Sequence, residues 1–74
     1  MEIQVKLFAT FRQGRFTAEK MEFPEGSTIL NVVEKLAIDP AEVAIAMING
    51  KSAELDAVLS EGDTLGLFPP VGGG

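Results

Sequence analysis

The sequence predicts a small α+β domain in which one main helix packs on a mixed sheet of four to five strands. Three observations support this fold class. Near both ends of the chain, apolar residues occupy every second position, as in strands with one buried face. Between these segments, one stretch spaces apolar residues three and four apart, as on one face of a helix. Asn49-Gly50, directly after an apolar run, is a strong signal for a two-residue hairpin.

The first two elements are predicted to be strands at residues 2–9 and 16–23. Alternate positions of the first segment carry Ile3, Val5 and Leu7. A polar break at residues 12–15 contains a glycine, which gives the backbone freedom to turn. The two strands are therefore expected to form a hairpin.

One amphipathic helix is predicted after the second strand. Ser27 or Thr28 can cap it, because a side-chain oxygen there accepts a free backbone N–H of the first turn. The helix is expected to end before Asp39 and Pro40, since proline excludes helical geometry from the residue before it. Its apolar stripe consists of Ile29, Val32, Val33 and Leu36.

The C-terminal half predicts a strand at residues 43–48, a short strand from Lys51 and a last strand at residues 64–68. Both faces of the third strand are apolar, so the pattern leaves its buried face open. Between the two later strands, Leu55, Val58 and Leu59 are expected to form an apolar patch over a turn or a short 3₁₀ segment. If the first and last strands lie side by side and parallel, the helix covers the face that carries Ile3, Val5, Leu7, Leu65 and Leu67.

Composition excludes several classes of function. The chain has 74 residues, enough for one small domain, and contains no cysteine or histidine. Disulfides, zinc–thiolate sites and Cys or His catalysis are therefore excluded, and no metal site is expected. The net charge of −5 argues against a nucleic-acid ligand. With no signal peptide and no apolar run of membrane-spanning length, the protein is expected to be cytoplasmic, with no membrane partner.

The chain divides into a folded domain at residues 1–68 and an extended tail at residues 69–74. Pro69 and Pro70 fix φ and remove two N–H donors, so the tail cannot extend the sheet. The glycines that follow have no side chains, and the tail end is expected to be flexible. Such a strand can thread a narrow channel and present a terminal carboxylate to another enzyme. The tail consists of Pro69, Pro70, Val71, Gly72, Gly73 and Gly74.

The tail and the strand before it resemble the end of the MoaD/ThiS family of ubiquitin-like sulfur carriers. The similarity includes residues 59–63, the strand through Phe68 and the Pro-Pro-Val-Gly-Gly-Gly ending; residues 5–9 and the Asn49-Gly50 hairpin also fit. The resemblance implies the β-grasp (ubiquitin-like) fold along nearly the whole chain. It is closest to the molybdopterin synthase small subunit, although Gly72 departs from that branch and triple glycine also occurs in the thiamine branch.

The resemblance implies a cycle that centres on Gly74. An E1-like activating enzyme uses ATP to adenylate its carboxylate, and a sulfur donor protein converts the adenylate to a thiocarboxylate. The carrier binds no cofactor tightly, and partner enzymes perform the chemistry. The implied acceptor enzyme is the molybdopterin synthase large subunit, with thiazole synthase of thiamine biosynthesis as the alternative.

The alternation of side chains along the first and last strands predicts a surface that binds a partner protein. With Leu7 and Leu67 facing the helix, Phe8 and Phe68 point to the opposite face, near the ends of two neighbouring strands. Aromatic residues are common at interface centres, so this pair and tail residues 69–73 are predicted to bind partners, with Arg12 at the rim. The alternative is that loops cover each phenylalanine.

Two other functions share these features. A ubiquitin-like modifier would use the same carboxylate to form isopeptide bonds, and a simple binding domain would have an inert tail. An enzyme is the weakest alternative, because the sequence contains no recognisable nucleophile or acid–base pair.

Overall fold

The computed structural model describes residues 1–70, which fold as a five-stranded sheet with one α-helix and two short 3₁₀ helices. The strands are β1 (Glu2–Leu7), β2 (Ala18–Glu22), β3 (Ile45–Ile48), β4 (Lys51–Ala53) and β5 (Thr64–Phe68). The helices are η1 (Ala9–Arg12), α1 (Ile29–Lys35) and η2 (Pro40–Glu42). None of the helices in this part of the chain is long and apolar enough to cross a membrane.

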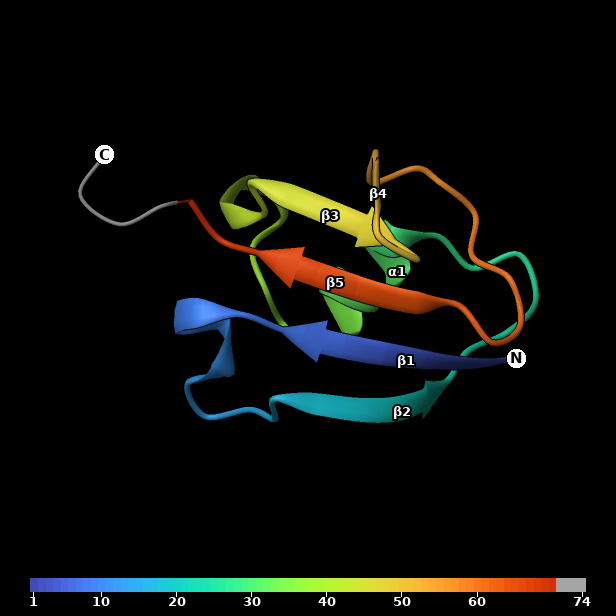
Figure 1. Ribbon diagram of the computed structural model, residues 1–74, viewed down its shortest axis with the longest axis horizontal. Helices are drawn as coiled ribbons and strands as arrows, with labels where there is room; N and C mark the ends of the chain where they lie inside the picture. The colour runs from blue at the N-terminus through green and yellow to red at the C-terminus, as the bar shows by residue number, and fades with distance from the viewer. Residues whose placement is uncertain (71–74) are drawn as a thin grey trace.

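The sheet has the strand order β2-β1-β5-β3-β4, and the neighbouring strands β1 and β5 are parallel (Figure 1). In the register of β1 and β5, Val5 lies beside Leu65 and Leu7 beside Leu67. The β1–β2, β3–β4 and β3–β5 pairs are antiparallel. The predicted hairpins and the predicted pairing of the first and last strands are therefore confirmed, as is the α+β class.

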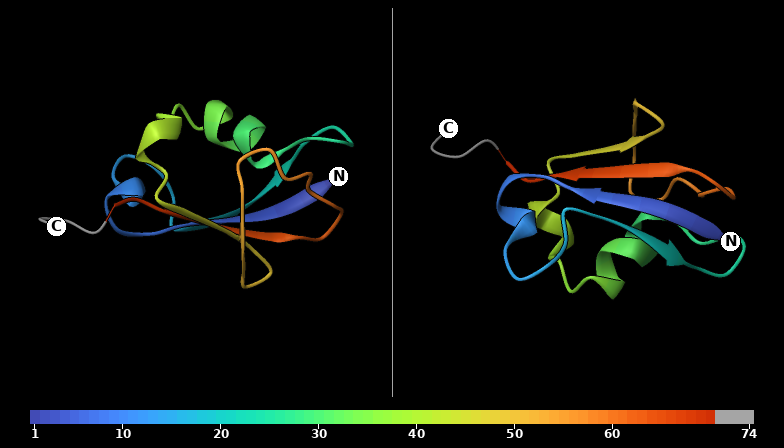
Figure 2. Two further views of the ribbon diagram at one scale, coloured as in Figure 1. Left: turned by 90° about the horizontal axis from the view of Figure 1, so that it is seen from above. Right: turned by 60° about the horizontal axis from the view of Figure 1, so that its bottom comes forward.

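The helix covers one face of the sheet and leaves the other face open (Figure 2). Its N-terminus is capped by Thr28, whose Oγ1 accepts the Asn31 amide at 3.3 Å, while the Asn31 side chain accepts the Thr28 amide at 2.8 Å. Because α1 is short, it depends on packing rather than on intrinsic helix stability. The buried hydrophobic core consists of Ile3, Val5, Leu7, Phe11, Phe23, Ile29, Val32, Val33, Ile38, Ala46, Leu59, Leu65 and Leu67.

Three strands are shorter than the sequence pattern predicts. β1 ends at Leu7 instead of residue 9, because Ala9 has a φ of +53° and begins η1. That turn places Phe11, which lies between the predicted first strand and the polar break at residues 12–15, in the core with 5% exposure. β2 begins at Ala18 instead of residue 16, and η2 delays the start of β3 to Ile45.

The structure identifies the buried face of β3, which the sequence left open. Ala46 lies beside Leu67 of β5 and is 5% exposed, so it faces the helix. Ile45 and Met47 therefore lie on the open face, where Ile45 is 49% exposed.

The segment between β4 and β5 forms turns without a 3₁₀ helix. Leu59 is buried and Leu55 half-buried, as the expected apolar patch requires. Val58 is 61% exposed, so the prediction that it belongs to this patch was wrong. Its backbone forms a bridge to Thr28 instead.

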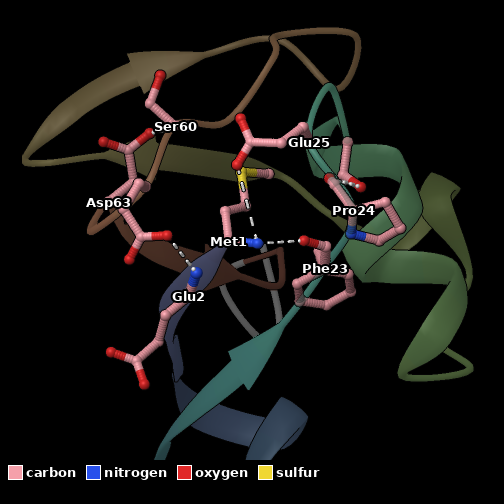
Figure 3. A network of polar contacts seen from close by, with 9 residues as sticks. Met1, Glu2, Phe23, Pro24, Glu25, Ser60 and Asp63 are labelled. Carbon is pink, nitrogen blue, oxygen red and sulfur yellow. Dashed lines mark hydrogen bonds and ion pairs between the residues drawn. The ribbon is translucent and has the colours of Figure 1, made fainter.

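Polar contacts of its backbone N–H and ammonium groups hold the start of β1 between the end of β2 and the turn before β5 (Figure 3). The ammonium group of Met1 donates to the carbonyl of Phe23 at 2.7 Å and lies 3.9 Å from the Glu25 carboxylate. The Glu2 amide donates to the Glu61 carboxylate at 2.9 Å. These contacts fix β1 in register, and β1 in turn positions its parallel neighbour β5, which leads into the tail.

Candidate functional site

The candidate site lies where β1 and β5 end, because parallel strands bring their carboxyl ends to the same edge of the sheet (Figure 1). Phe68 is the last residue of β5, and Phe8 follows β1, with its amide donating to the Leu67 carbonyl at 3.2 Å. The two rings stack with centroids 4.1 Å apart and planes 6° from parallel. Both side chains are half-buried, so the pair that parity predicted forms an accessible apolar surface.

Arg12 lies beside this aromatic pair, at the rim where it was expected. Its guanidinium carbon is 5.6 Å from the centroid of the Phe8 ring, within the range of a cation–π contact. Its Nε donates to the Leu7 carbonyl at 2.8 Å, which fixes the side chain in place. The end of β1 therefore presents an apolar stack with an oriented positive charge at its edge.

Gly66 is a site residue that the sequence reasoning missed. A β-carbon built on Gly66 would lie 3.4 Å from the Phe8 ring and 3.5 Å from the Phe68 ring. The two rings therefore lie close to the backbone of Gly66, which carries no side chain between the strand and the rings. The available signal was a glycine in the middle of a strand pattern, which often marks a close approach.

Other open-face side chains surround Gly66. In the sheet register, Lys6 of β1 lies on one side of it and Met47 of β3 on the other. Together with the aromatic pair they enclose a shallow hollow of about 170 Å³. Its lining residues are Lys6, Phe8, Met47, Gly50, Thr64, Gly66 and Phe68. We call this feature the Gly66 hollow.

The root of the tail borders a second hollow, on the helix side of the sheet. Pro69 is half-buried and Pro70 exposed, and both line a space of about 360 Å³ together with Phe11 and Ile38 of the core. Arg15 borders it and donates to the carbonyls of residues 11, 36 and 37 at 3.2–3.4 Å. These contacts tie the loop after η1 to the end of α1.

The remaining predicted site residues, Val71, Gly72, Gly73 and Gly74, lie outside the described residues. Within residues 1–70, no group of three or more acidic side chains gathers as a metal site would require. The described part of the site has an apolar centre, the Phe8–Phe68 pair, with the basic side chains of Lys6, Arg12 and Arg15 around it.

A family model described as the ThiS family matches residues 5–74, nearly the whole chain. The chain belongs to the ThiS family. No curated protein sequence matches it significantly.

Solved structures similar to this ThiS-family chain share its β-grasp fold. A proposed molybdopterin converting factor subunit 1 from Pyrococcus furiosus is 31% identical, with a TM-score of 0.78, covering 96% of this chain and 99% of the other. Small archaeal modifier protein 1 from Haloferax volcanii is 24% identical, with a TM-score of 0.75 and coverage of 95% and 98%. One chain from a complex of subunits 1 and 2 of molybdopterin-converting factor from Helicobacter pylori matches at 19% identity and a TM-score of 0.68, with full coverage of both chains. The last two similarities concern the fold alone.

Proposed function

We propose that this protein is a sulfur carrier that works through the main-chain carboxylate of Gly74. An E1-like enzyme adenylates that carboxylate with ATP, and pyrophosphate leaves. A persulfide of a donor protein then attacks the acyl adenylate and displaces AMP. A second thiol cleaves the resulting acyl disulfide, so that the donor leaves as a disulfide and a C-terminal thiocarboxylate remains. The chain is a carrier and not an enzyme in this cycle, and it holds no cofactor tightly. We place the cycle in the cytoplasm, where the activating enzyme has access to ATP.

The observation that carries this proposal is the extent of the family match, which continues through the tail to residue 74. The composition supports the same chemistry. With no cysteine and no histidine in the sequence, the chain has no side-chain thiol or imidazole that could carry sulfur. A carboxylate that is first adenylated and then attacked by sulfur requires neither group.

We further propose that the sulfur goes to molybdopterin formation, with the chain as the small subunit of the synthase. The Phe68-Pro69-Pro70-Val71 segment and the 31% identical P. furiosus structure support this branch. The H. pylori structure is a complex of subunits 1 and 2 of molybdopterin-converting factor, which suggests a large subunit as the partner here. Phe8, Phe68 and tail residues 69–73 are the proposed binding residues for the activating enzyme and the large subunit.

Two alternative functions would use the same Gly74 carboxylate. The ThiS-family match supports thiazole synthase as the acceptor enzyme. A modifier would instead join the same carboxylate to lysines of other proteins, and the fold is one that small archaeal modifier protein 1 shares. All three functions require activation of Gly74 first, and they differ in the acceptor that finally receives the acyl group or its sulfur.

Intact-protein mass spectrometry tests the proposal. The chain is incubated with ATP, the cognate activating enzyme and a sulfur donor. We expect replacement of one oxygen by sulfur at the C-terminus; isopeptide adducts would instead support the modifier, and no adenylate at all would refute both. Deletion of Gly74 should abolish activation without changing the thermal unfolding midpoint, and Glu54→Gln, an exposed change outside the site, serves as the control.

A further inference from the structure

The outer strand β2 presents one edge of its backbone to solvent, at the side of the sheet away from β4 (Figure 1). At one end of the β1–β2 pair, the Phe23 amide donates to the Met1 carbonyl at 2.9 Å. At the other end, the Leu7 amide donates to the Thr17 carbonyl at 2.9 Å. Because bonded and non-bonded pairs alternate in an antiparallel ladder, the odd-numbered residues of β2 bond to β1. The N–H and C=O groups of residues 18, 20 and 22 therefore point away from the sheet.

The side chains of β2 on the open face carry charges that this sheet does not compensate. Glu2 and Glu22 are directly opposite each other in the register of β1 and β2, and both are exposed. They form a non-bonded pair, in which side chains lie closest, so their carboxylates repel. Lys20 lies two residues from Glu22 on the same face and is exposed. It forms no ion pair within residues 1–70, where the contact between the Met1 ammonium group and Glu25 is the one present.

A second copy of β2 compensates both charges. When two β2 strands pair antiparallel about Met21, Lys20 of each copy lies opposite Glu22 of the other. These two residues are the ones whose backbone groups point outward, so each facing pair can exchange two N–H···O bonds. The lysine of the second copy also lies beside the Glu2–Glu22 pair and offsets its repulsion.

Charge favours this register over its neighbours. Pairing centred on Lys20 sets two lysines opposite each other. Pairing centred on Glu22 opposes two glutamates and places Lys20 against Pro24, which has no N–H to donate. In the register centred on Met21, the two methionine side chains meet on the core side of the sheet, where Met21 is half-buried against the core. The centre of the contact is therefore apolar and its flanks are ion pairs.

We propose that two copies of this chain associate through β2 as an antiparallel dimer with Met21 on its two-fold axis and reciprocal Lys20–Glu22 ion pairs. The two sheets then form one continuous sheet, and the exposed edge of β2 is covered. Antiparallel pairing directs the C-terminal ends of the two β5 strands to opposite ends of the dimer. The dimer leaves the Phe8–Phe68 pair uncovered, and the inference does not depend on the fate of Gly74.

The dimer is expected to be reversible and dependent on concentration. The paired segment is short, residues 20–22 of each copy, which is typical of weak interfaces. Each copy has a net charge of −5, so the copies repel each other at long range. At about 0.15 M salt the Debye length is ~8 Å, so this repulsion is screened more than ion pairs in contact.

Two charge reversals test the pairing. Lys20→Glu makes both flanking positions acidic and Glu22→Lys makes both basic, so a dimer of either variant alone opposes like charges. Self-association is measured by sedimentation equilibrium with interference optics, because the chain has no tryptophan or tyrosine. We expect each variant to self-associate at least about tenfold more weakly than the wild type. Mixed in equal amounts, the two variants oppose unlike charges at both facing pairs and should form a heterodimer at least as tight as the wild-type dimer.

Lys35→Glu and Glu34→Lys on α1 are matched controls, because they change the net charge equally at exposed positions. Each should self-associate as the wild type does, and mixing them should give no gain. Hydrogen exchange gives a second readout that names the residues. The amides of Lys20 and Glu22 should exchange more slowly as the wild-type concentration rises, whereas Ser52 on the opposite edge strand should not change.

Three results would overturn the inference. The first is a wild type that stays monomeric up to ~1 mM, where even weak complexes form. The second is a pair of single variants that each dimerise as the wild type does. The third is a mixture that associates no more tightly than either variant alone. Thermal unfolding by circular dichroism verifies that the variants fold, which the exposure of both positions leads us to expect.

Discussion

The carboxylate of Asp63 joins the turn before β5 to the β3–β4 hairpin, and its removal should measurably destabilise the domain. One oxygen accepts the Asn49 side-chain amide at 2.9 Å, and the other accepts the Ser60 backbone amide at 2.7 Å. The Asn49 side-chain oxygen accepts the Thr64 amide at 2.9 Å, so the network extends to the first residue of β5. Asp63→Ala leaves the Asn49 side-chain amide and the Ser60 backbone amide without their acceptor.

The expected loss follows from these two hydrogen bonds. Bonds to charged groups contribute roughly 1.5–3 kcal/mol each, but water can replace the carboxylate at this half-buried position, so we expect a total of about 2 kcal/mol. In a domain of this size ~1 kcal/mol corresponds to a shift of about 4–8 °C, so the unfolding midpoint should fall by ~8–16 °C. Asp63→Asn should lose about half as much free energy, because its amide oxygen can still accept the Ser60 N–H.

Urea and thermal unfolding followed by far-UV circular dichroism provide the assay, since the chain has no tryptophan or tyrosine for fluorescence. A double-mutant cycle of Asn49→Ala and Asp63→Ala isolates the contact between the two side chains, and we expect a coupling free energy of about 1 kcal/mol. An Asp63→Ala protein as stable as the wild type, or a coupling of zero, would show that water replaces this carboxylate fully and that the network does not hold β5 to the hairpin.

Two further substitutions test the ends of α1. Ala37 has a φ of +58° in a turn that closes the helix, with its amide donating to the Glu34 carbonyl at 3.0 Å and the next amide to Val33 at 3.1 Å. Ala37→Gly removes the left-handed strain, although glycine loses more backbone entropy on folding. We expect the free energy of unfolding, measured in urea, to rise by about 0.5–1 kcal/mol; a decrease would contradict this reasoning. Thr28→Ala removes the cap and should cost about 1 kcal/mol, whereas Thr17→Ala in the loop before β2 should change the same measurement little.

The apolar pattern predicted the orientation of those strands in which only every second residue is apolar. In β1, positions 3, 5 and 7 are apolar and buried, so the side chain that follows, Phe8, must point to the open face. The same argument for β5, combined with parallel pairing, brings Phe8 and Phe68 together. This part of the candidate site was predictable because it needs no more than parity and one correct strand pairing.

Other features depend on tertiary contacts that no local pattern contains. Both faces of β3 are apolar, and its orientation follows from pairing Ala46 with Leu67. Ala9 adopts a positive φ although alanine gives no signal for it, because the turn buries Phe11. The Gly66 hollow requires three strands in register, so a single strand pattern could indicate the glycine but not the side chains around it.

The division of roles between this chain and its partners follows from the same geometry. Under the proposed function the reactive group is a main-chain carboxylate, which is chemically identical in a sulfur carrier and in a modifier. The group that receives the sulfur or the acyl group is presented by the partner enzyme, so the fate of the activated carboxylate depends on which enzyme binds. Under the same proposal, the chain influences that choice through the side chains beside the tail root, among them the stacked pair of Phe8 and Phe68. Substitutions on the open face should therefore change which partner binds while leaving the reactivity of an already activated Gly74 unchanged.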